Sequence, residues 1–272
     1  MACIIDKFSD DESDLELSST TLDALKSFYA ERDARAEQFA KLQAEAEERH
    51  ALNVKLSMDA FTEDWNESQF WYSDETATFL AKQLLRDATP ETSIAVVSAP
   101  SVFVQLKNLL NSDEYKDKPK PGKLTLLEHD NRFAVFADEF VFYDFAQPLK
   151  LPANLKGAFD RVIVDPPFLS EDCQTKAALT VRWMLKPQET KPMIIACTGE
   201  RMETLITEKL YKSFGVRTTT FEPKHARGLS NEFYCYANFD VKPEEGAKEE
   251  TPEAKGWTLR ELGWKEKATT TA

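Results

Sequence analysis

The sequence has few glycines, few histidines and only four cysteines, and it contains no long hydrophobic run. The 272 residues include 8 Gly, 3 His and 4 Cys. Eight glycines are too few for collagen-like or repeat-rich β architectures. No stretch approaches the ~18 apolar residues of a membrane helix, and the acidic N-terminus lacks the basic flank and apolar run of a signal peptide. These absences predict a cytoplasmic protein with no membrane partner.

The four cysteines lie far apart in the sequence and form no CxxC pair: Cys3, Cys173, Cys197 and Cys235. The strong zinc and redox spacings are therefore missing, and we expect reduced thiols and no metal site. His50 and His129 are interpreted as structural residues. Neither GxGxxG nor GxxxxGK[ST] occurs, which disfavours NAD and nucleotide phosphate sites.

Acidic residues outnumber basic ones, with 47 Asp and Glu against 34 Lys and Arg and a formal net charge of −13. This balance argues against a protein that holds nucleic acid through a broad basic face. Residues 1–64 have 16 acidic and 7 basic residues, whereas residues 65–240 have 24 and 21. Residues 65–240 are thus nearly neutral, which weakens the charge argument against nucleic-acid binding for this part of the chain. The acidic N-terminal region becomes a candidate for steering a basic protein substrate.

Three parts of the chain differ in composition. Residues 1–60 are expected to form an acidic lead-in and a helical extension, because good helix formers dominate residues 30–52. Residues 61–240 form the main domain. Residues 241–272 are charged and are expected to form a flexible tail, in which only a few side chains could pack: Trp257, Leu259, Leu262 and Trp264.

Strand and helix patterns alternate through the main domain. Apolar runs predict five strands, and helical segments follow all of them except the third. Ser73 is the expected N-cap of the helix before the first strand, and Gly215 closes the last helix, which is expected over residues 200–215. Two alternating segments, 216–226 and 231–240, then predict an antiparallel hairpin. This order indicates an α/β fold with an open, doubly wound, mostly parallel sheet.

Ligands of such open sheets bind at the carboxyl ends of the strands. That rule points to four places in this sequence. They are residues 98–101, residues 128–130, Asp144 and residues 165–168.

The most informative of these places is Asp165-Pro166-Pro167-Phe168. Two successive prolines forbid a helix and fix an extended turn, which can present the Asp165 carboxylate and the Pro166 carbonyl as adjacent acceptors. An amine that donates to both acceptors would point its lone pair toward an electrophile held in line. Phe168 can stack on the group that carries the nitrogen. An Asp-Pro-Pro sequence by itself would be interpreted as a simple turn. Here it lies at a strand end and precedes an aromatic residue, and this position favours a catalytic role.

DPPF is similar to the [DNS]-PP-[FYW] signature of amino-group methyltransferases that use S-adenosylmethionine. Six blocks in order resemble one family within them, the eukaryotic protein-lysine methyltransferases that modify translation elongation factor 1-alpha. The blocks are QFWYSDETA, VSAPSVF, EHDNRFA, EFVFYDF, VDPPFLSEDC and EPKHARGLSNEFYCYANFD. Members of this family were once labelled putative adenine-N6 DNA methyltransferases. The resemblance implies a seven-stranded Rossmann-like methyltransferase sheet with an antiparallel last strand.

The resemblance also implies a cofactor site for S-adenosylmethionine. The residues that would line the methionine end are Phe70, Trp71, Tyr72, Ser73 and Thr76. Glu128, with Asp130 as the second candidate, would accept from the ribose hydroxyls, and Asp144 would accept from the adenine amino group. The turn after the first strand is Ser98-Ala99-Pro100-Ser101, whereas the superfamily usually has a glycine-rich turn at this place. Its small residues still allow the cofactor to approach. Ser101 could cap the next helix.

The connection between the final strands would carry the family's substrate loop. Its candidate substrate-binding residues are His225, Arg227, Asn231 and Glu232. A solvated hairpin loop is an equally good interpretation of this segment.

These observations predict a protein-lysine N-methyltransferase with elongation factor 1-alpha as its substrate and partner. Two alternatives stay open: an adenine-N6 methyltransferase of DNA or RNA, and a non-catalytic adaptor with a vestigial cofactor fold. Salt-sensitive DNA binding would favour the first alternative. Absence of cofactor binding would favour the second.

Overall fold

A computed structural model of the chain describes residues 26, 27, 30, 57, 58, 61, 70–228, 233–248 and 250–261. The chain divides into two compact units, Met1–Glu45 and Ala46–Ala272, and every element described below belongs to the second. The predicted acidic lead-in, most of the long N-terminal helix, His50, Cys3, Leu262 and Trp264 lie outside the described residues. None of the described helices has both the length and the apolar character needed to cross a membrane.

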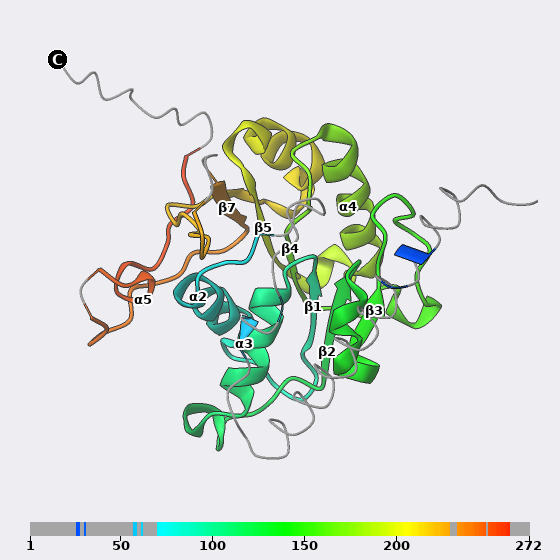
Figure 1. The fold of residues 1–272 in the computed structure, drawn as a ribbon. Helices are drawn as coiled ribbons and strands as arrows, with labels where there is room; N and C mark the ends of the chain where they lie inside the picture. Colours follow the sequence, from blue (N-terminus) through cyan, green and yellow to red (C-terminus); the bar gives the residue numbers. More distant parts are fainter. Residues whose placement is uncertain are drawn as a thin grey trace, which may run out of the picture. The chain divides into compact units, whose positions relative to one another are not determined.

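Seven strands form one sheet in the order β3-β2-β1-β4-β5-β7-β6 (Figure 1). They are β1 Ser93–Val97, β2 Lys123–Glu128, β3 Phe140–Phe142, β4 Arg161–Val164, β5 Met193–Gly199, β6 Arg217–Thr218 and β7 Phe233–Ala237. Strands β1 to β5 pair in parallel, and β7 runs antiparallel to both of its neighbours. The predicted doubly wound, mostly parallel seven-stranded sheet with an antiparallel last strand is confirmed.

Helices cover both faces of the sheet (Figure 1). The α-helices are α2 Asp74–Leu85, α3 Pro100–Leu110, α4 Glu171–Met184 and α5 Pro252–Lys255. Side chains of β1 alternate between two cores: Ile94 and Val96 pack with α2 and α3, whereas Ala95 and Val97 pack with α4. This alternation follows from the two-residue period of a strand that is buried on both sides.

Several short helical turns complete the α/β connections. They are η3 Asp113–Tyr115, η4 Asn131–Glu139, η5 Ala153–Leu155, η6 Gln188–Thr190, η7 Glu200–Met202, η8 Leu205–Leu210 and η9 Lys212–Phe214. Ser73 caps α2 as predicted, because its hydroxyl accepts from the Thr76 N–H. The last predicted helix, which Gly215 was expected to close, is instead broken into η7, η8 and η9.

The break in that helix has a packing reason. Element η8 is a π-helix, and the Tyr211 N–H donates to the Ile206 carbonyl five residues back. This wider turn buries both Ile206 and Tyr211, each about 1% exposed. Gly215 ends the segment at φ 73°, a left-handed conformation that glycine adopts without steric cost and that agrees with the predicted C-cap.

Within residues 241–261, Val241 and Trp257 are buried against the main domain and Leu259 pairs with it, as expected for Trp257 and Leu259, whereas residues 242–246 are exposed. Val241 and Trp257 exchange backbone hydrogen bonds, and Leu259 pairs with Thr219 next to β6. Trp257 is 1% exposed and its ring lies 5.5 Å from that of Phe79 in α2. Truncation of a buried tryptophan to alanine typically costs ~3–5 kcal/mol, so this segment contributes to the stability of the domain.

Candidate active site

A cavity of about 340 Å³ opens at the carboxyl ends of the parallel strands. Its lining includes residues that follow β1, β2, β3, β4 and β5, together with the segment before α2 and the loop before β7. The lining residues are Phe70, Trp71, Tyr72, Ser98, Ala99, Pro100, Ser101, Glu128, His129, Tyr143, Asp144, Phe145, Asp165, Pro166, Pro167, Phe168, Leu169, Arg201, His225 and Phe233. The strand-end rule therefore located the cavity correctly from the sequence.

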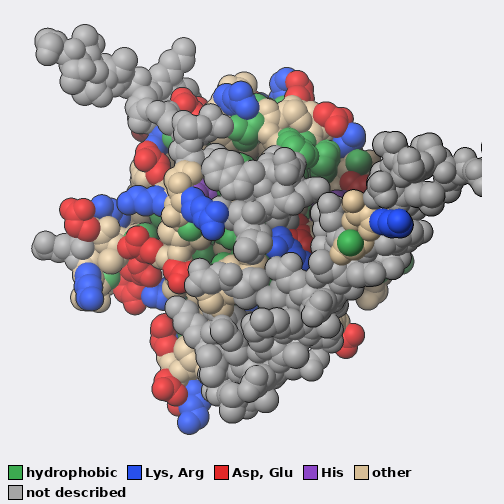
Figure 2. Space-filling model, in the orientation of Figure 1, with side chains coloured by type: hydrophobic (Ala, Val, Ile, Leu, Met, Phe, Trp, Pro, Cys, Tyr) green, Lys and Arg blue, Asp and Glu red, His purple; other side chains and the backbone are tan. Residues whose placement is uncertain are grey.

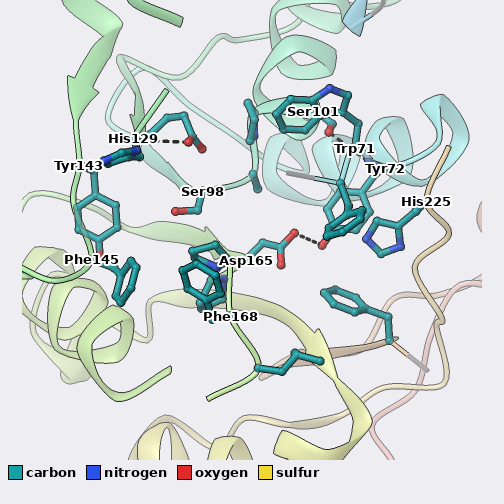
Figure 3. Close-up of a pocket in the computed structure, with 18 of the residues that line it drawn as sticks. Trp71, Tyr72, Ser98, Ser101, His129, Tyr143, Phe145, Asp165, Phe168 and His225 are labelled. Atoms are coloured by element: carbon teal, nitrogen blue, oxygen red, sulfur yellow. Dashed lines mark hydrogen bonds between the residues drawn. The ribbon is translucent and has the colours of Figure 1, made fainter. Parts of the chain in front are cut away.

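Asp165 lies where β4 ends, and its carboxyl group faces the cavity (Figure 3). The Tyr72 hydroxyl donates to Asp165 Oδ2 at 2.6 Å, while no hydrogen bond from a described residue reaches Oδ1. Burial raises the pKa of Asp165 to about 8, against a weaker lowering by the Tyr72 hydrogen bond. The side chain nevertheless lines the cavity. An aspartate of this kind can accept or release a proton near neutral pH.

The rest of the DPPF turn is held by side chains of the adjoining helix and strand. Gln174 of α4 donates from Nε2 to the Phe168 carbonyl and to Thr198 Oγ1, both at 3.0 Å. Phe168 is 40% exposed, and its ring meets that of Phe145 edge to face at 5.6 Å. Both rings line the cavity, and the exposed Phe168 ring suits contact with an aliphatic or cationic chain.

Glu128 ends β2 and is 7% exposed. Its Oε1 accepts from the backbone N–H groups of His129 at 2.8 Å and Asp130 at 3.2 Å. No described residue donates to Oε2, so that oxygen can accept from a ligand. Burial raises the pKa of Glu128 to about 7, although the two backbone hydrogen bonds oppose the shift.

Asp144 follows β3 and is oriented by the turn that it begins. Its Oδ1 accepts from the Ala146 N–H at 2.8 Å, and its Oδ2 accepts from Gln147 Nε2 at 3.2 Å. Each carboxylate oxygen has a second lone pair, so Asp144 can still accept from a ligand donor. Glu128 and Asp144 therefore give one side of the cavity two oriented carboxylates.

The turn after β1 adopts the conformation that glycine usually provides. Ser98 has φ 53°, which is uncommon for a residue with a side chain. Pro100 begins α3, so Ser101 lies inside the helix and does not cap it. The Ser101 hydroxyl instead accepts from the Tyr72 N–H at 3.2 Å, which joins this turn to the segment before α2.

Three aromatic residues form the wall next to Asp165. The rings of Tyr72 and His225 lie 4.9 Å apart, and His225 meets Phe233 edge to face at 4.8 Å. Burial lowers the pKa of His225 to about 4, so the ring is neutral at physiological pH. His225 therefore contributes a neutral wall beside Asp165 and adds no positive charge there.

A sequence profile for the family described as probable N6-adenine methyltransferase matches residues 63–241. Protein-lysine N-methyltransferase EFM5 of Saccharomyces cerevisiae is 43% identical over 235 residues, which cover 82% of this chain and 92% of that protein. EEF1A lysine methyltransferase 1 of Gallus gallus is 41% identical over 232 residues, which cover 85% and 97%. This chain belongs to the EFM5 and EEF1A lysine methyltransferase 1 family.

Membership of the EFM5 and EEF1A lysine methyltransferase 1 family confirms the family predicted from the ordered motifs. Among solved structures, a SAM dependent methyltransferase from Aquifex aeolicus aligns with a TM-score of 0.36 at 11% identity. The alignment covers 61% of this chain and 89% of that one.

Some site residues predicted from the sequence do not line the cavity. Ser73 caps α2, and Thr76 Oγ1 accepts from the Lys224 N–H at 3.0 Å. Asp130 binds the Arg132 guanidinium at 2.6 Å. Arg227 does not line the cavity either, and Asn231 and Glu232 lie outside the described residues. The structure thus separates Glu128, which faces the cavity, from Asp130, which does not.

Five lining residues lie outside the places predicted from the sequence: Tyr143, Phe145, Leu169, Arg201 and Phe233. Ser101 and His129 lie inside those places but were not assigned to a ligand. Tyr143, Phe145 and Leu169 are sequence neighbours of candidates at strand ends, so a wider window around each strand end would have included them. Arg201 follows β5, a strand end to which the rule was not applied. No local signal marks Phe233, which reaches the cavity through the β5–β7 pairing.

Proposed function

We propose that this chain transfers a methyl group from S-adenosylmethionine to a lysine of translation elongation factor 1-alpha. Its relatives EFM5 and EEF1A lysine methyltransferase 1 are named for protein-lysine methylation, and the chain spans more than nine-tenths of each. The observation that carries the proposal is the shared cavity. Asp165 of the DPPF turn faces the same space as the carboxylates of Glu128 and Asp144.

The residues at the ends of β2 and β3 fit the adenosine part of the cofactor. Glu128 Oε2 is available to a ribose hydroxyl, and Asp144 can accept from an amino group. Phe70, Trp71 and the turn from Ser98 onward line the space assigned to the methionine part. A cavity of about 340 Å³ lies within the ~300–1,000 Å³ typical of small-molecule sites.

Bound S-adenosylmethionine supplies an electrophilic methyl group carried by a positively charged sulfur. A free lysine has a pKa of ~10.4, so its ammonium group must lose a proton before the nitrogen lone pair can attack. Asp165, with a pKa raised to about 8, is a stronger proton acceptor than an ordinary aspartate. We assign it two tasks: it accepts an N–H of the amine, and it stabilises the positive charge that grows on nitrogen.

Arg201 is assigned to the protein substrate. It is exposed, lies in η7 just after β5, and forms no hydrogen bond or ion pair with a described residue. The neighbouring Gly199 packs against Leu169, so this turn adjoins the loop that carries Asp165 and Phe168. In the sheet order, β5 lies on the side of β4 opposite to β1, β2 and β3. Arg201 can therefore bind an acidic group close to the target lysine.

The deciding experiment incubates the purified chain with methyl-labelled S-adenosylmethionine and, separately, elongation factor 1-alpha, DNA and RNA. We expect label only in the protein, at a lysine identified by mass spectrometry. Asp165→Ala should lower turnover by at least ~10²–10³-fold while the cofactor dissociation constant stays within about threefold. Full turnover by Asp165→Ala, or label confined to nucleic acid, would overturn the proposal.

Adenine-N6 methylation is the second candidate, because the matching family carries that description. An exocyclic adenine amine could occupy the same place beside Asp165. Charge argues against this substrate: on the face shown in Figure 2, basic and acidic side chains are interspersed among the coloured residues and no continuous basic surface is visible. A nucleic-acid enzyme should also bind DNA with a steep salt dependence, which the same preparation can test.

A cytoplasmic location agrees with this substrate. Cys173, Cys197 and Cys235 are free thiols, the state that a reducing compartment maintains. Fractionation of cells that express the untagged chain tests the location.

A further inference from the structure

We propose that Tyr72 is a positioning residue for Asp165: its hydroxyl holds Oδ2 and thereby turns Oδ1 toward the amine. This inference rests on the proposed function, in which Asp165 receives the amine. The resemblance assigns Tyr72 to the cofactor, but its hydroxyl donates to Asp165 at 2.6 Å (Figure 3). A carboxyl group bound through one oxygen cannot rotate freely, so the other oxygen keeps a fixed direction.

Tyr72 is itself held by segments that are distant in the sequence. Its N–H donates to Ser101 Oγ in α3, and it forms an antiparallel bridge with His225. The Ala226 N–H donates to the Trp71 carbonyl at 2.9 Å, next to that bridge. The ring is 3% exposed and packs against the ring of His225 at 4.9 Å, with the Phe233 ring 6.4 Å away. The hydroxyl therefore has a defined position before any ligand arrives.

The hydroxyl can act as a donor over the whole working pH range. Burial, followed by the charge of Asp165, raises the pKa of Tyr72 well above its usual value. Other titratable groups around the pair are Glu128 at the end of β2, Cys173 in α4 and Cys197 in β5. Arg201, His129, Asp144 and His225 face the same cavity.

Removal of the hydroxyl has a defined electrostatic sign. The Tyr72 hydrogen bond lowers the pKa of Asp165, whereas burial and Glu128 raise it. Without that hydrogen bond the pKa of Asp165 must rise further, so the carboxyl group stays protonated to higher pH. A protonated carboxyl group is a poorer acceptor for the amine, and the low-pH limb of the activity profile should move to higher pH.

The test compares Tyr72→Phe with Tyr236→Phe. Tyr236 is also fully buried and its hydroxyl donates to the Gly199 carbonyl at 3.4 Å, but it does not line the cavity. Both variants keep the aromatic ring, so both should fold. Carboxyl ¹³C NMR of the ligand-free protein, with the Asp165 signal assigned through Asp165→Asn, should show a higher pKa of Asp165 in Tyr72→Phe only.

Kinetics supply the second measurement. At neutral pH, Tyr72→Phe should lower kcat by ~10–100-fold, the loss expected for a hydrogen bond to a charged group, and the deficit should shrink as the pH rises. The dissociation constant for the cofactor should stay within about threefold of wild type. A cofactor affinity at least tenfold weaker, with an unchanged Asp165 titration, would instead make Tyr72 a cofactor residue and overturn the inference.

The double variant Asp165→Asn/Tyr72→Phe separates this inference from the proposed function. If Tyr72 acts through Asp165, the second substitution should change the pH dependence of thermal unfolding little once Asp165 is neutral. If Tyr72→Phe changed thermal unfolding equally in the wild-type and the Asp165→Asn proteins, Tyr72 would have only a packing role. The NMR and unfolding measurements need no substrate, so they remain decisive even if elongation factor 1-alpha is not methylated.

Discussion

The two halves of the cavity are organised in different ways. On the β2 and β3 side, Glu128 and Asp144 are oriented by backbone N–H groups one or two residues further along the chain. On the β4 side, Asp165 is oriented by Tyr72, which is 93 residues away in the sequence. We call these two sides the cofactor half and the amine half, after the ligands proposed for them. The Glu128 and Asp144 carboxylates of the first are oriented by short local segments, whereas Asp165 of the second depends on the packing of remote ones.

This difference predicts different sensitivities to mutation. A change in the loop that carries His225 should disturb the amine half, because that loop holds Tyr72 in place. The same change should leave Glu128 and Asp144 in position. The predictions below test each half separately.

Glu128→Gln should have the largest effect on the cofactor half. The substitution weakens an acceptor for the ribose, and loss of a charged hydrogen bond should weaken cofactor binding by ~10–100-fold. Asp130→Asn is the matched control, because Asp130 is paired with Arg132 outside the cavity. Calorimetry should find the control within about threefold of wild type. An equal loss in both variants would contradict the local assignment.

Cofactor binding should also depend on pH through Glu128. Its pKa of about 7 is raised by burial, so the group becomes protonated as the pH falls through 7. Only the ionised group accepts with both oxygens, and affinity should therefore fall by up to about tenfold per pH unit below 7. S-adenosylhomocysteine is the best probe because it lacks the positively charged sulfonium. That charge would interact with Asp165 and add a second pH dependence to the binding. The slope should disappear in Glu128→Gln.

Arg201→Ala should have a moderate effect that is confined to the protein substrate. Loss of one exposed ion pair should raise KM for elongation factor 1-alpha by ~3–10-fold and leave cofactor affinity unchanged. Arg201→Lys, which keeps the charge, should recover part of the loss. Weaker cofactor binding in Arg201→Ala would place this side chain on the cofactor instead.

His225→Phe should have the smallest effect. The histidine is neutral and its described contacts are with rings, so phenylalanine should keep activity within about threefold. His225→Ala should cost more, because it removes the ring that packs on Tyr72. A KM increase that is equally large in both variants would show that the imidazole nitrogens bind the substrate, as the sequence pattern allowed.

The same contrast explains how much could be predicted from the sequence. The strand ends, the DPPF turn and the Ser73 cap follow from local patterns, and the structure confirms their positions. The left-handed Ser98 could not be predicted, because a serine gives no signal for positive φ. The π-helical turn at Tyr211 depends on burial in a core that only the folded chain creates. The Tyr72–Asp165 contact could not be predicted either, because it joins residues 93 positions apart that only the folded sheet brings together.

The packing of Trp257 has a consequence for protein synthesis. Its indole fills a space between Phe79 in α2, Phe221 and Phe239, and its Nε1 donates to the Phe239 carbonyl. Because a nascent chain emerges from its N-terminus, α2 and the first strands leave the ribosome long before this tryptophan exists. Until residue 257 has emerged, no indole can fill the space between those rings, so this part of the core closes only after that residue is made.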